Sequence, residues 1–494
     1  MKKHLLVCAF IFMLPRPVMA SEAETFEALV RAKEWRAAGL MMFDRAGQLS
    51  TSDLVTSEMV EAGYYPEALA RADSQSGGAK AYSLLLIARH ADELSHPQRL
   101  ELLARAEQDA TGLKNLWVSS AISAAYLALG SEVDAQRVVT SIMAIPDVNA
   151  QEYRELAEAF ERLPPGVNVG PWFTDQLSAR LEFVKPGFNT AFAFQKVSLL
   201  YYRGGDTVKA RSTLLKGLEN VIYIRDRRGR QTANNALART ALEFGDIGLA
   251  KQYGEPRALI AAFALYAART GNTQRALDIL PSLGANLYVD HRDGTIRGII
   301  REAIGRGDLV TAKTFIKLVS PTASRPPALY WLQIAEIARS KRRASEAEAA
   351  TRIALEPYLQ GPAVGPGSYH FPDLYLMAVM LMASGEVEKA RVLSDHFDPM
   401  IDAIKPKMPM KYIEPRSLAA SLCGKLRDFD CSAREIMAAY EALRQDMSHS
   451  VTASSPKSGY AMASDYIKVG SALGAIAISS ASKPGANGER NIGR

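Results

Sequence analysis

The sequence GDTVKAR at Gly205–Arg211 has four close relatives elsewhere in the chain. These are GDIGLAK from Gly245, GNTQRAL from Gly271, GDLVTAK from Gly307 and GEVEKAR from Gly385. Each places alanine five residues after the glycine. Apolar residues at three- and four-residue steps flank each glycine, as in helices with one buried face. The pattern predicts two helices joined by a glycine turn, and it predicts that this unit is repeated.

The local chemistry of the repeated stretch supports this prediction. Gly205 can adopt the left-handed conformation that ends a helix, and Asp206 can cap the next helix with its side-chain oxygen. Ala210 then lies where a small side chain lets the two helices approach closely. If they do cross there, the seventh residue before the glycine must also be small, which provides an independent test.

Nine frames can be tested in this way, and seven of them hold alanine or serine at the seventh position before the anchor. The anchors are Gly63, Gly130, Gly205, Gly245, Gly271, Gly307, Arg342, Gly385 and Asp428. The residues seven before them are Thr56, Ser123, Ser198, Ala238, Ala264, Ile300, Ala335, Ala378 and Ser421. All nine frames have alanine five residues after the anchor: Ala68, Ala135, Ala210, Ala250, Ala276, Ala312, Ala347, Ala390 and Ala433.

These units resemble the tetratricopeptide repeat (TPR) family, whose period is 34 residues. The best matches are SAAYLALGSEVDAQ (Ser123–Gln136) and SLLYYRGGDTVKAR (Ser198–Arg211), in which Tyr126 and Tyr201 take the aromatic position. The resemblance covers about three quarters of the chain after its leader. It implies an all-α fold in which antiparallel helix pairs stack into a right-handed superhelix, an α-solenoid. A repeat architecture of this kind does not by itself specify a function.

The chain also departs from the family pattern. The step from Gly245 to Gly271 is too short for a full repeat, and the long early steps should contain weaker pairs. We expect one such pair at Ala81–Glu107, and another that joins EYRELAEAFERL (Glu152–Leu163) to WFTDQLSARLEF (Trp172–Phe183). The tryptophan of the family pattern is missing.

The two ends of the chain differ in composition from the repeats. Lys2 and Lys3, the apolar run Leu5–Leu14 and Ala20 form a pattern typical of a cleaved signal peptide, which predicts a periplasmic or secreted protein. No other stretch reaches transmembrane length. The predicted organisation is a signal peptide at 1–20, N-terminal helical repeats at 21–163, a joint with an irregular helix pair at 164–185, a TPR-like array at 186–445, a capping helix region at 446–480 and a disordered tail at 481–494.

Charge and cysteine content narrow the classes of partner. The formal net charge is +6, and it falls to +3 without Lys2, Lys3 and Arg16 of the leader, so we do not expect nucleic-acid binding. Cys423 and Cys431 remain after the leader is removed. In an oxidising compartment this pair can form a disulfide between adjacent helices, and two free buried thiols are the equal alternative.

No motif for catalysis, metal or cofactor emerges, so we expect a protein that is not an enzyme. The seven histidines lack metal-ligand spacing, and neither a phosphate-binding loop nor a nucleophile elbow occurs. An exported helical superhelix can also belong to a lytic enzyme of peptidoglycan. That resemblance would require a separate catalytic domain, and no residual segment is long enough to supply one.

Two groups of residues are the candidate binding sites. In the TPR family the first helix of each pair lines the concave groove, which predicts inward-facing Asn235, Arg239, Arg297, Arg301 and Glu336 and, with its arginines, a carboxylate or phosphate ligand. The second group is a basic loop, either solvated or a docking patch for an anionic partner such as an acidic protein, lipid headgroup or cell-wall polymer. It comprises Arg225, Arg227, Arg228 and Arg230.

The sequence therefore predicts an exported helical scaffold or adaptor that binds a protein or peptide partner in a cell-envelope complex, of the secretion, pilus, polysaccharide or division type. Two alternatives stay open. The first alternative is that the chain is the helical part of an enzyme that processes cell-wall glycan. The second is that it is an immunity or effector-binding protein. A pair of carboxylates about 5–10 Å apart in a deep groove would favour the enzyme.

Overall fold

The computed structural model describes residues 22–49, 54–91, 93–111, 116–164, 166–283, 289–319, 327–359, 371–395, 397, 401, 410–452 and 459–481. These residues form helices and connections with no strand among them, so the fold is an all-α solenoid, as predicted. The signal peptide expected at 1–20 and almost all of the tail expected at 481–494 lie outside the described residues.

The chain divides into two compact units, and each is described by itself. One unit combines Met1–Tyr64 with Val387–Arg494, and the other is the continuous segment Tyr65–Glu386. The domain limits predicted at residues 163 and 185 both fall inside the continuous unit.

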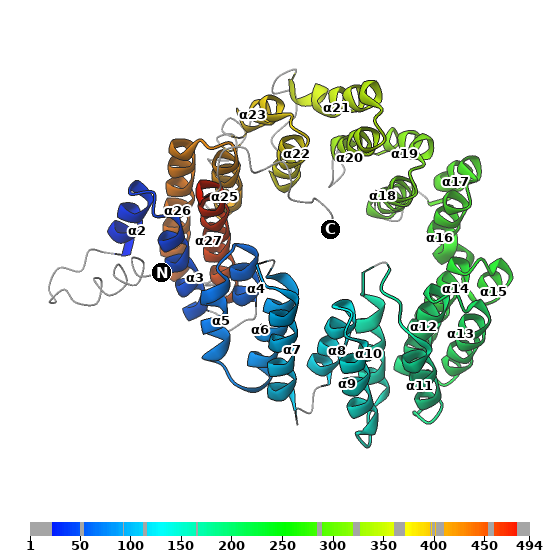
Figure 1. Ribbon diagram of the computed structural model, residues 1–494. Coiled ribbons are helices and arrows are strands. Elements are labelled where there is room, and N and C mark those ends of the chain that lie inside the picture. Colours follow the sequence, from blue (N-terminus) through cyan, green and yellow to red (C-terminus); the bar gives the residue numbers. More distant parts are fainter. Residues whose placement is uncertain are drawn as a thin grey trace. The chain divides into compact units, whose positions relative to one another are not determined.

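The continuous unit is a succession of helix pairs (Figure 1). Its first helices contact one another in order along the chain, and each second helix packs on the first helix of its own pair. After α5 (Tyr65–Asp73), the first helices are α6 (Gly77–His90), α8 (Trp117–Ala128), α10 (Ala150–Glu161), α12 (Phe188–Arg203), α14 (Arg227–Glu243), α16 (Pro256–Arg269), α18 (Val289–Gly305), α20 (Pro327–Ser340) and α22 (Phe371–Ala383).

The second helices vary more in length than the first helices do. They are α7 (His96–Ala110), α9 (Glu132–Ala144), α11 (Pro171–Leu181), α13 (Thr207–Val221), α15 (Ile247–Tyr253), α17 (Thr273–Ile279, followed by the 3-10 turn Leu280–Leu283), α19 (Leu309–Ile316) and α21 (Ala344–Leu359). The second helices α7, α11, α13 and α19 also pack on the next first helix. The seven-residue α15 explains why the step from Gly245 to Gly271 is so short.

The other unit joins helices from both ends of the chain. It contains α2 (Glu22–Arg31), α3 (Trp35–Leu49), α4 (Leu54–Glu61), α23 (Val387–Asp395), α25 (Met410–Lys425), α26 (Phe429–Thr452) and α27 (Gly459–Ala481). The last of these helices, α27, packs against both α3 and α25. Glycines permit both contacts, because a Cβ atom on Gly470 of α27 would lie 3.0 Å from the ring of Phe43 on α3. Likewise, a Cβ atom on Gly424 of α25 would lie 2.9 Å from Ile476 on α27.

The turns inside the pairs share one backbone geometry. At Gly205, which has a φ of 86°, the glycine N–H donates to the Tyr202 carbonyl and the Asp206 N–H donates to the Tyr201 carbonyl. This is the Schellman motif that ends a helix with a left-handed residue. The same pair of hydrogen bonds recurs at Lys33, Gly63, Gly130, Gly245, Gly271, Gly307, Arg342, Gly385 and Arg427.

The small residues lie where the sequence predicted them. Ala210, Ala276 and Ala390 are all 0% exposed, and Ala238, Ala264 and Ala335 on the first helices are at most 1% exposed. The prediction that small side chains are buried at the helix crossings is confirmed at these positions.

The frame anchored at Asp428 was wrong by one residue. The left-handed residue is Arg427, with a φ of 62°, so the true counterparts are Ala420 and Ser432, each 0% exposed. A further turn at Lys33, with a φ of 60°, was missed. Its counterparts, Phe26 and Ala38, are also fully buried.

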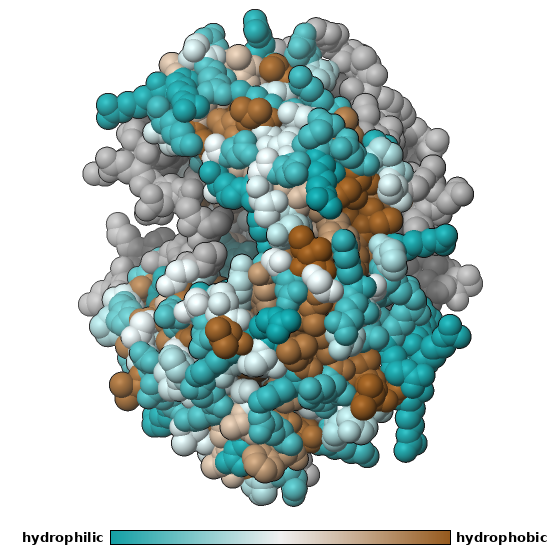
Figure 2. All heavy atoms as spheres, turned by 90° about the vertical axis from the view of Figure 1, so that its right-hand side faces the viewer, coloured by the Kyte–Doolittle hydropathy of each residue, from teal (hydrophilic) through white to brown (hydrophobic). Residues whose placement is uncertain are grey.

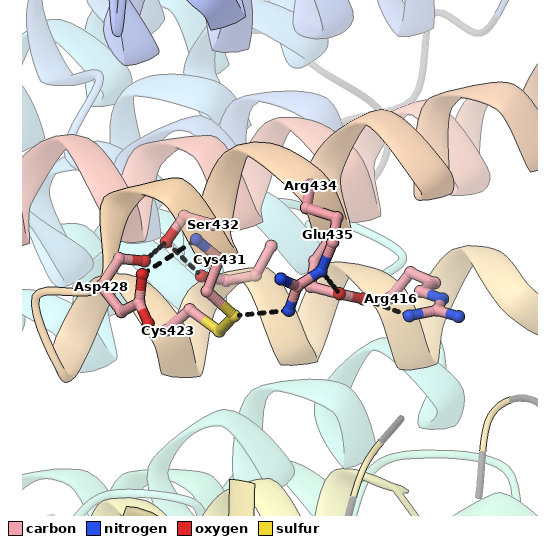
Figure 3. Close-up of a disulfide and its surroundings, with 8 residues drawn as sticks. Arg416, Cys423, Asp428, Cys431, Ser432, Arg434 and Glu435 are labelled. Atoms are coloured by element: carbon pink, nitrogen blue, oxygen red, sulfur yellow. Dashed lines mark hydrogen bonds and ion pairs between the residues drawn. A yellow bond between two sulfur atoms is a disulfide. The ribbon is translucent and has the colours of Figure 1, made fainter. Parts of the chain in front are cut away.

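A disulfide joins Cys423 of α25 to Cys431 of α26, with the two Cα atoms 5.8 Å apart (Figure 3). Next to it, Glu435 is 1% exposed and forms ion pairs with Arg416 and Arg434. Arg434 also points an Nη2 atom at Cys431 Sγ, at 3.4 Å. The disulfide and the buried carboxylate therefore fasten the same two helices from adjacent positions.

Candidate functional site

A connected set of hollows lies where α9 leads into α10 and α11 leads into α12. The largest, which we call the loop groove, has a volume of about 770 Å³. It is lined by residues 145–151, Tyr153, Arg180 and residues 183–190. A hollow of about 630 Å³ shares residues 145–148 with it, and one of about 390 Å³ shares Arg180 and Phe183.

Capping interactions fix both walls of the loop groove. The Asn149 side chain accepts hydrogen bonds from the N–H groups of Gln151 and Glu152, at 2.9 and 3.2 Å, and Glu152 accepts one from the Asn149 N–H at 2.9 Å. This reciprocal capping box starts α10. On the other wall, the Thr190 hydroxyl donates to the Lys185 carbonyl at 2.7 Å.

Large apolar side chains are exposed around the loop groove. Phe183 is 87% exposed, Ile145 42% and Phe188 38%. Arg180 and Lys185 add positive charge, and Asp147, whose φ is 64°, holds a left-handed conformation that a non-glycine residue seldom adopts. An exposed aromatic side chain beside a hollow and a cation has the composition of a protein-binding site.

The sequence did not single out this groove. Phe183 was expected to continue a helix that contains Leu177 and Leu181, but α11 ends at Leu181 and leaves Phe183 in the connection. Pro186 and Gly187 lie three and four residues after Phe183. They are the one local signal that could have placed Phe183 on a turn instead of a buried face.

Two of the predicted inward-facing residues hold the start of α16. The Asn235 Oδ1 atom accepts a hydrogen bond from the Glu255 N–H at 2.9 Å, and Arg239 Nη2 donates to the Ala258 carbonyl at 3.2 Å. Both side chains project from α14 and support the neighbouring first helix. Their observed contacts are therefore structural ones within the array.

The other three predicted residues lie on α18 and α20. Arg297 Nε donates to the Asp293 carbonyl within its own helix, at 3.3 Å, and Arg301 and Glu336 are exposed. Arg239 projects from α14 and Arg301 from α18, and α16 packs against both of these helices. The shared anionic ligand predicted for these two arginines stays a prediction.

The predicted basic loop is mostly the first turn of a helix. Arg225 lies in the connection, while Arg227, Arg228 and Arg230 begin α14, which Asp226 caps. Arg230 turns back to donate to the Ile224 carbonyl at 3.1 Å. The side chains of Arg225, Arg227 and Arg228 are exposed.

Tyr126 and Tyr201, which the TPR resemblance singled out, use their hydroxyls alike. Tyr201 donates to Asp175 Oδ1 at 2.6 Å, and Tyr126 donates to Glu107 Oε2 at 3.4 Å. Burial, with the nearby Glu107 carboxylate second, raises the pKa of Tyr126 to about 12. The hydrogen bond from Tyr201 lowers the pKa of Asp175, and the bond from Lys209 adds to this effect.

The part of the chain that the structure describes has neither a metal-binding cluster nor a membrane-spanning helix. It contains no group of three or more histidine, cysteine, aspartate or glutamate side chains arranged to hold a metal ion. Among its helices, none has both the length and the apolar character needed to cross a bilayer.

Comparison with known proteins identifies no family. No protein-family model matches the chain, and no curated protein matches it significantly. Among solved structures, Ton1535 from Thermococcus onnurineus NA1 is similar over 78% of this chain and 96% of its own, at 13% identity and a TM-score of 0.27. A circular tandem repeat protein is similar over 86% of this chain and 82% of its own, at 16% identity and a TM-score of 0.15. Likenesses this weak carry no functional argument.

Proposed function

We propose that this protein is a binding scaffold of TPR-like repeats that holds a polypeptide segment of a partner protein in the loop groove. The observation that carries the proposal is Phe183, an aromatic side chain that is 87% exposed at the edge of a hollow of about 770 Å³. An aromatic side chain buries 150–250 Å² when it is covered, so it can supply much of the energy of a complex. The signal-peptide pattern supports an exported protein of the cell envelope.

The groove chemistry favours a segment with an apolar side chain next to an acidic one. Phe183, Ile145 and Phe188 offer an apolar surface, and Arg180 and Lys185 lie on the same lining. Central aromatic anchors typically dominate binding energy, while charges at the rim guide orientation and exclude wrong partners. Repeat arrays commonly use such a rigid preformed surface to bind peptides.

Binding is favoured over glycan hydrolysis by the roles of the nearby carboxylates. Glu107, Asp147 and Glu152 line the adjoining hollow of about 630 Å³. Glu107 forms an ion pair with Arg137, and Glu152 is engaged in the cap of α10. Because two of the three carboxylates already have structural partners, the hollow offers no evident acid–base pair of the kind that a glycosidase uses.

The test is a random peptide library displayed on phage and panned against the immobilised full chain. Enriched peptides would then be synthesised and titrated against the wild type and Phe183→Asp. We expect affinity to fall at least about tenfold, as for the loss of a central aromatic anchor. The matched control is Val208→Asp, because Val208 is 78% exposed on α13 and does not line the groove. Equal binding by Phe183→Asp and the wild type would remove the proposal.

A further inference from the structure

The corner between α13 and α14 combines exposed apolar and cationic side chains. Ile222 is 70% exposed and Tyr223 is 59% exposed. Arg225, Arg227 and Arg228 follow within five residues, and all three are exposed. We call these five residues the basic corner.

The basic corner is not explained by the stability of the fold. Arg227 and Arg228 occupy the first turn of α14, where the positive end of the helix dipole disfavours cations. Within the described part of the chain, the guanidinium groups of Arg225, Arg227 and Arg228 have no hydrogen-bond or ion-pair partner. Arg230 differs, because it caps the Ile224 carbonyl and so has a structural role.

Acidic residues nearby do not cancel the charge. Residues 219–230 contain four arginines and two acids, Glu219 and Asp226. Asp226 is already engaged, since its side chain accepts hydrogen bonds from the N–H groups of Arg228 and Gly229. The segment therefore keeps a net positive charge that faces solvent together with Ile222 and Tyr223.

The shape of the corner discriminates between classes of partner. It is the turn between α13 and α14, and its apolar side chains project into solvent. The three hollows described above are lined by other residues. Peptide-binding sites often provide a groove that covers the apolar side chains of the peptide. A bilayer instead accepts projecting side chains, with tyrosine at the headgroup level and arginines on lipid phosphates. On the face shown in Figure 2, hydrophobic side chains occur as separate clusters among hydrophilic ones.

We propose that the basic corner binds the surface of a bilayer that contains anionic phospholipid. Ile222 and Tyr223 enter the interface, and Arg225, Arg227 and Arg228 bind lipid phosphates. The contact is peripheral and reversible, because a few side chains supply far less binding energy than an inserted helix. Salt weakens it by screening the arginines.

The experiment is co-sedimentation of the full chain with vesicles of phosphatidylcholine, with and without phosphatidylglycerol. We expect binding only to the anionic vesicles. Each arginine near an anionic surface contributes a factor of about five to the partition coefficient, so Arg225→Glu, Arg227→Glu and Arg228→Glu together should lower it about a hundredfold or more. The matched control reverses three exposed cations elsewhere, with Lys251→Glu, Arg257→Glu and Arg275→Glu, which cause the same change in net charge.

A second variant reports direct contact. Tyr223→Trp should lose fluorescence in anionic vesicles with brominated acyl chains, measured against the wild type with its four native tryptophans. The proposal is overturned if both triple variants bind vesicles equally, if the tryptophan is not quenched, or if the chain binds polyglutamate but no vesicles, since that result would assign the corner to an acidic polypeptide. Phe183→Asp should still bind vesicles, so failure of the peptide-binding proposal would be visible separately.

Discussion

The hydroxyl of Tyr201 on α12 donates a 2.6 Å hydrogen bond to Asp175 on α11, and Lys209 on α13 contacts the same carboxylate at 2.9 and 3.1 Å. One carboxylate therefore ties together three consecutive helices. Glu107 of α7 plays the corresponding part for Tyr126 and Arg137. In both frames, a carboxylate on one second helix binds a tyrosine and a cation of the next helix pair. This arrangement therefore links consecutive helix pairs.

The hydrogen bond between Tyr201 and Asp175 should be measurable as a coupling energy. We expect Tyr201→Phe to lower the free energy of unfolding by about 1–2 kcal/mol, because it removes a hydrogen bond to a charged acceptor and leaves Lys209 as the remaining donor to Asp175. In urea denaturation, a double-mutant cycle with Asp175→Asn should give a coupling of about 1 kcal/mol. Tyr202→Phe is the matched control, with an expected change within about 0.5 kcal/mol. Strict additivity of Tyr201→Phe and Asp175→Asn would refute the coupling.

Ion pairs between second helices, or between a second helix and the cap residue of another, repeat this fastening along the array. They join residues 30 to 35 positions apart in sequence, close to one repeat period. The pairs are Arg105 with Asp73, Arg137 with Glu107, Lys209 with Asp175, Lys216 with Glu182, Arg211 with Asp246 and Lys313 with Glu346. Most are half-exposed, so each contributes modestly and the set matters more than any member.

Acid should weaken the array through these carboxylates. Hydrogen bonds lower the pKa of Asp134, Asp175, Asp246 and Glu346, chiefly from Ser131, Tyr201, the Leu249 N–H and Lys313 respectively. A carboxyl with a lowered folded-state pKa stabilises the fold above its unfolded value of about 4, and this stabilisation is lost as the pH falls through the folded value. The urea concentration at the midpoint of unfolding should therefore fall as the pH is lowered below about 4. Asp175→Asn should show a shallower drop than the wild type, and identical profiles would contradict the assignment.

The helix crossings leave no room for a larger side chain. Ala210 is 0% exposed, so Ala210→Leu should cost about 1–3 kcal/mol, the usual effect of overpacking. Val208→Leu on the same helix is the control, because Val208 is 78% exposed and its replacement should change little. Thermal unfolding followed by circular dichroism at 222 nm would compare the two. Equal midpoints would show that the crossing is looser than the burial of Ala210 indicates.

Residue spacing was enough to predict the repeated turns, because glycine at a left-handed position and alanine at a crossing are both demanded by sterics. It succeeded at Arg342 but failed at two other turns where a residue other than glycine adopts the same conformation. Arg427 and Lys33 carry no glycine to mark them, so one frame was misplaced and one was missed. The loop groove could not be predicted either, because it depends on how two connections lie against each other. Periodicity within a helix gives no information about that arrangement.

Arg342 occupies a turn position that glycine fills in most of the other frames. Its φ is 57°, and a left-handed residue with a side chain costs roughly 1–2 kcal/mol relative to glycine. Part of this gain is offset by the greater freedom of glycine in the unfolded chain, so Arg342→Gly should stabilise by about 0.5–1 kcal/mol. Arg352→Gly, in the interior of α21, should instead destabilise by about 1 kcal/mol.

The converse change, Gly271→Ala, should cost about 1–2 kcal/mol through the backbone alone, since no atom lies within 4 Å of the added Cβ. Urea denaturation of the three variants decides the matter: if Arg342→Gly is no more stable than the wild type, the left-handed turn at Arg342 is not a source of strain.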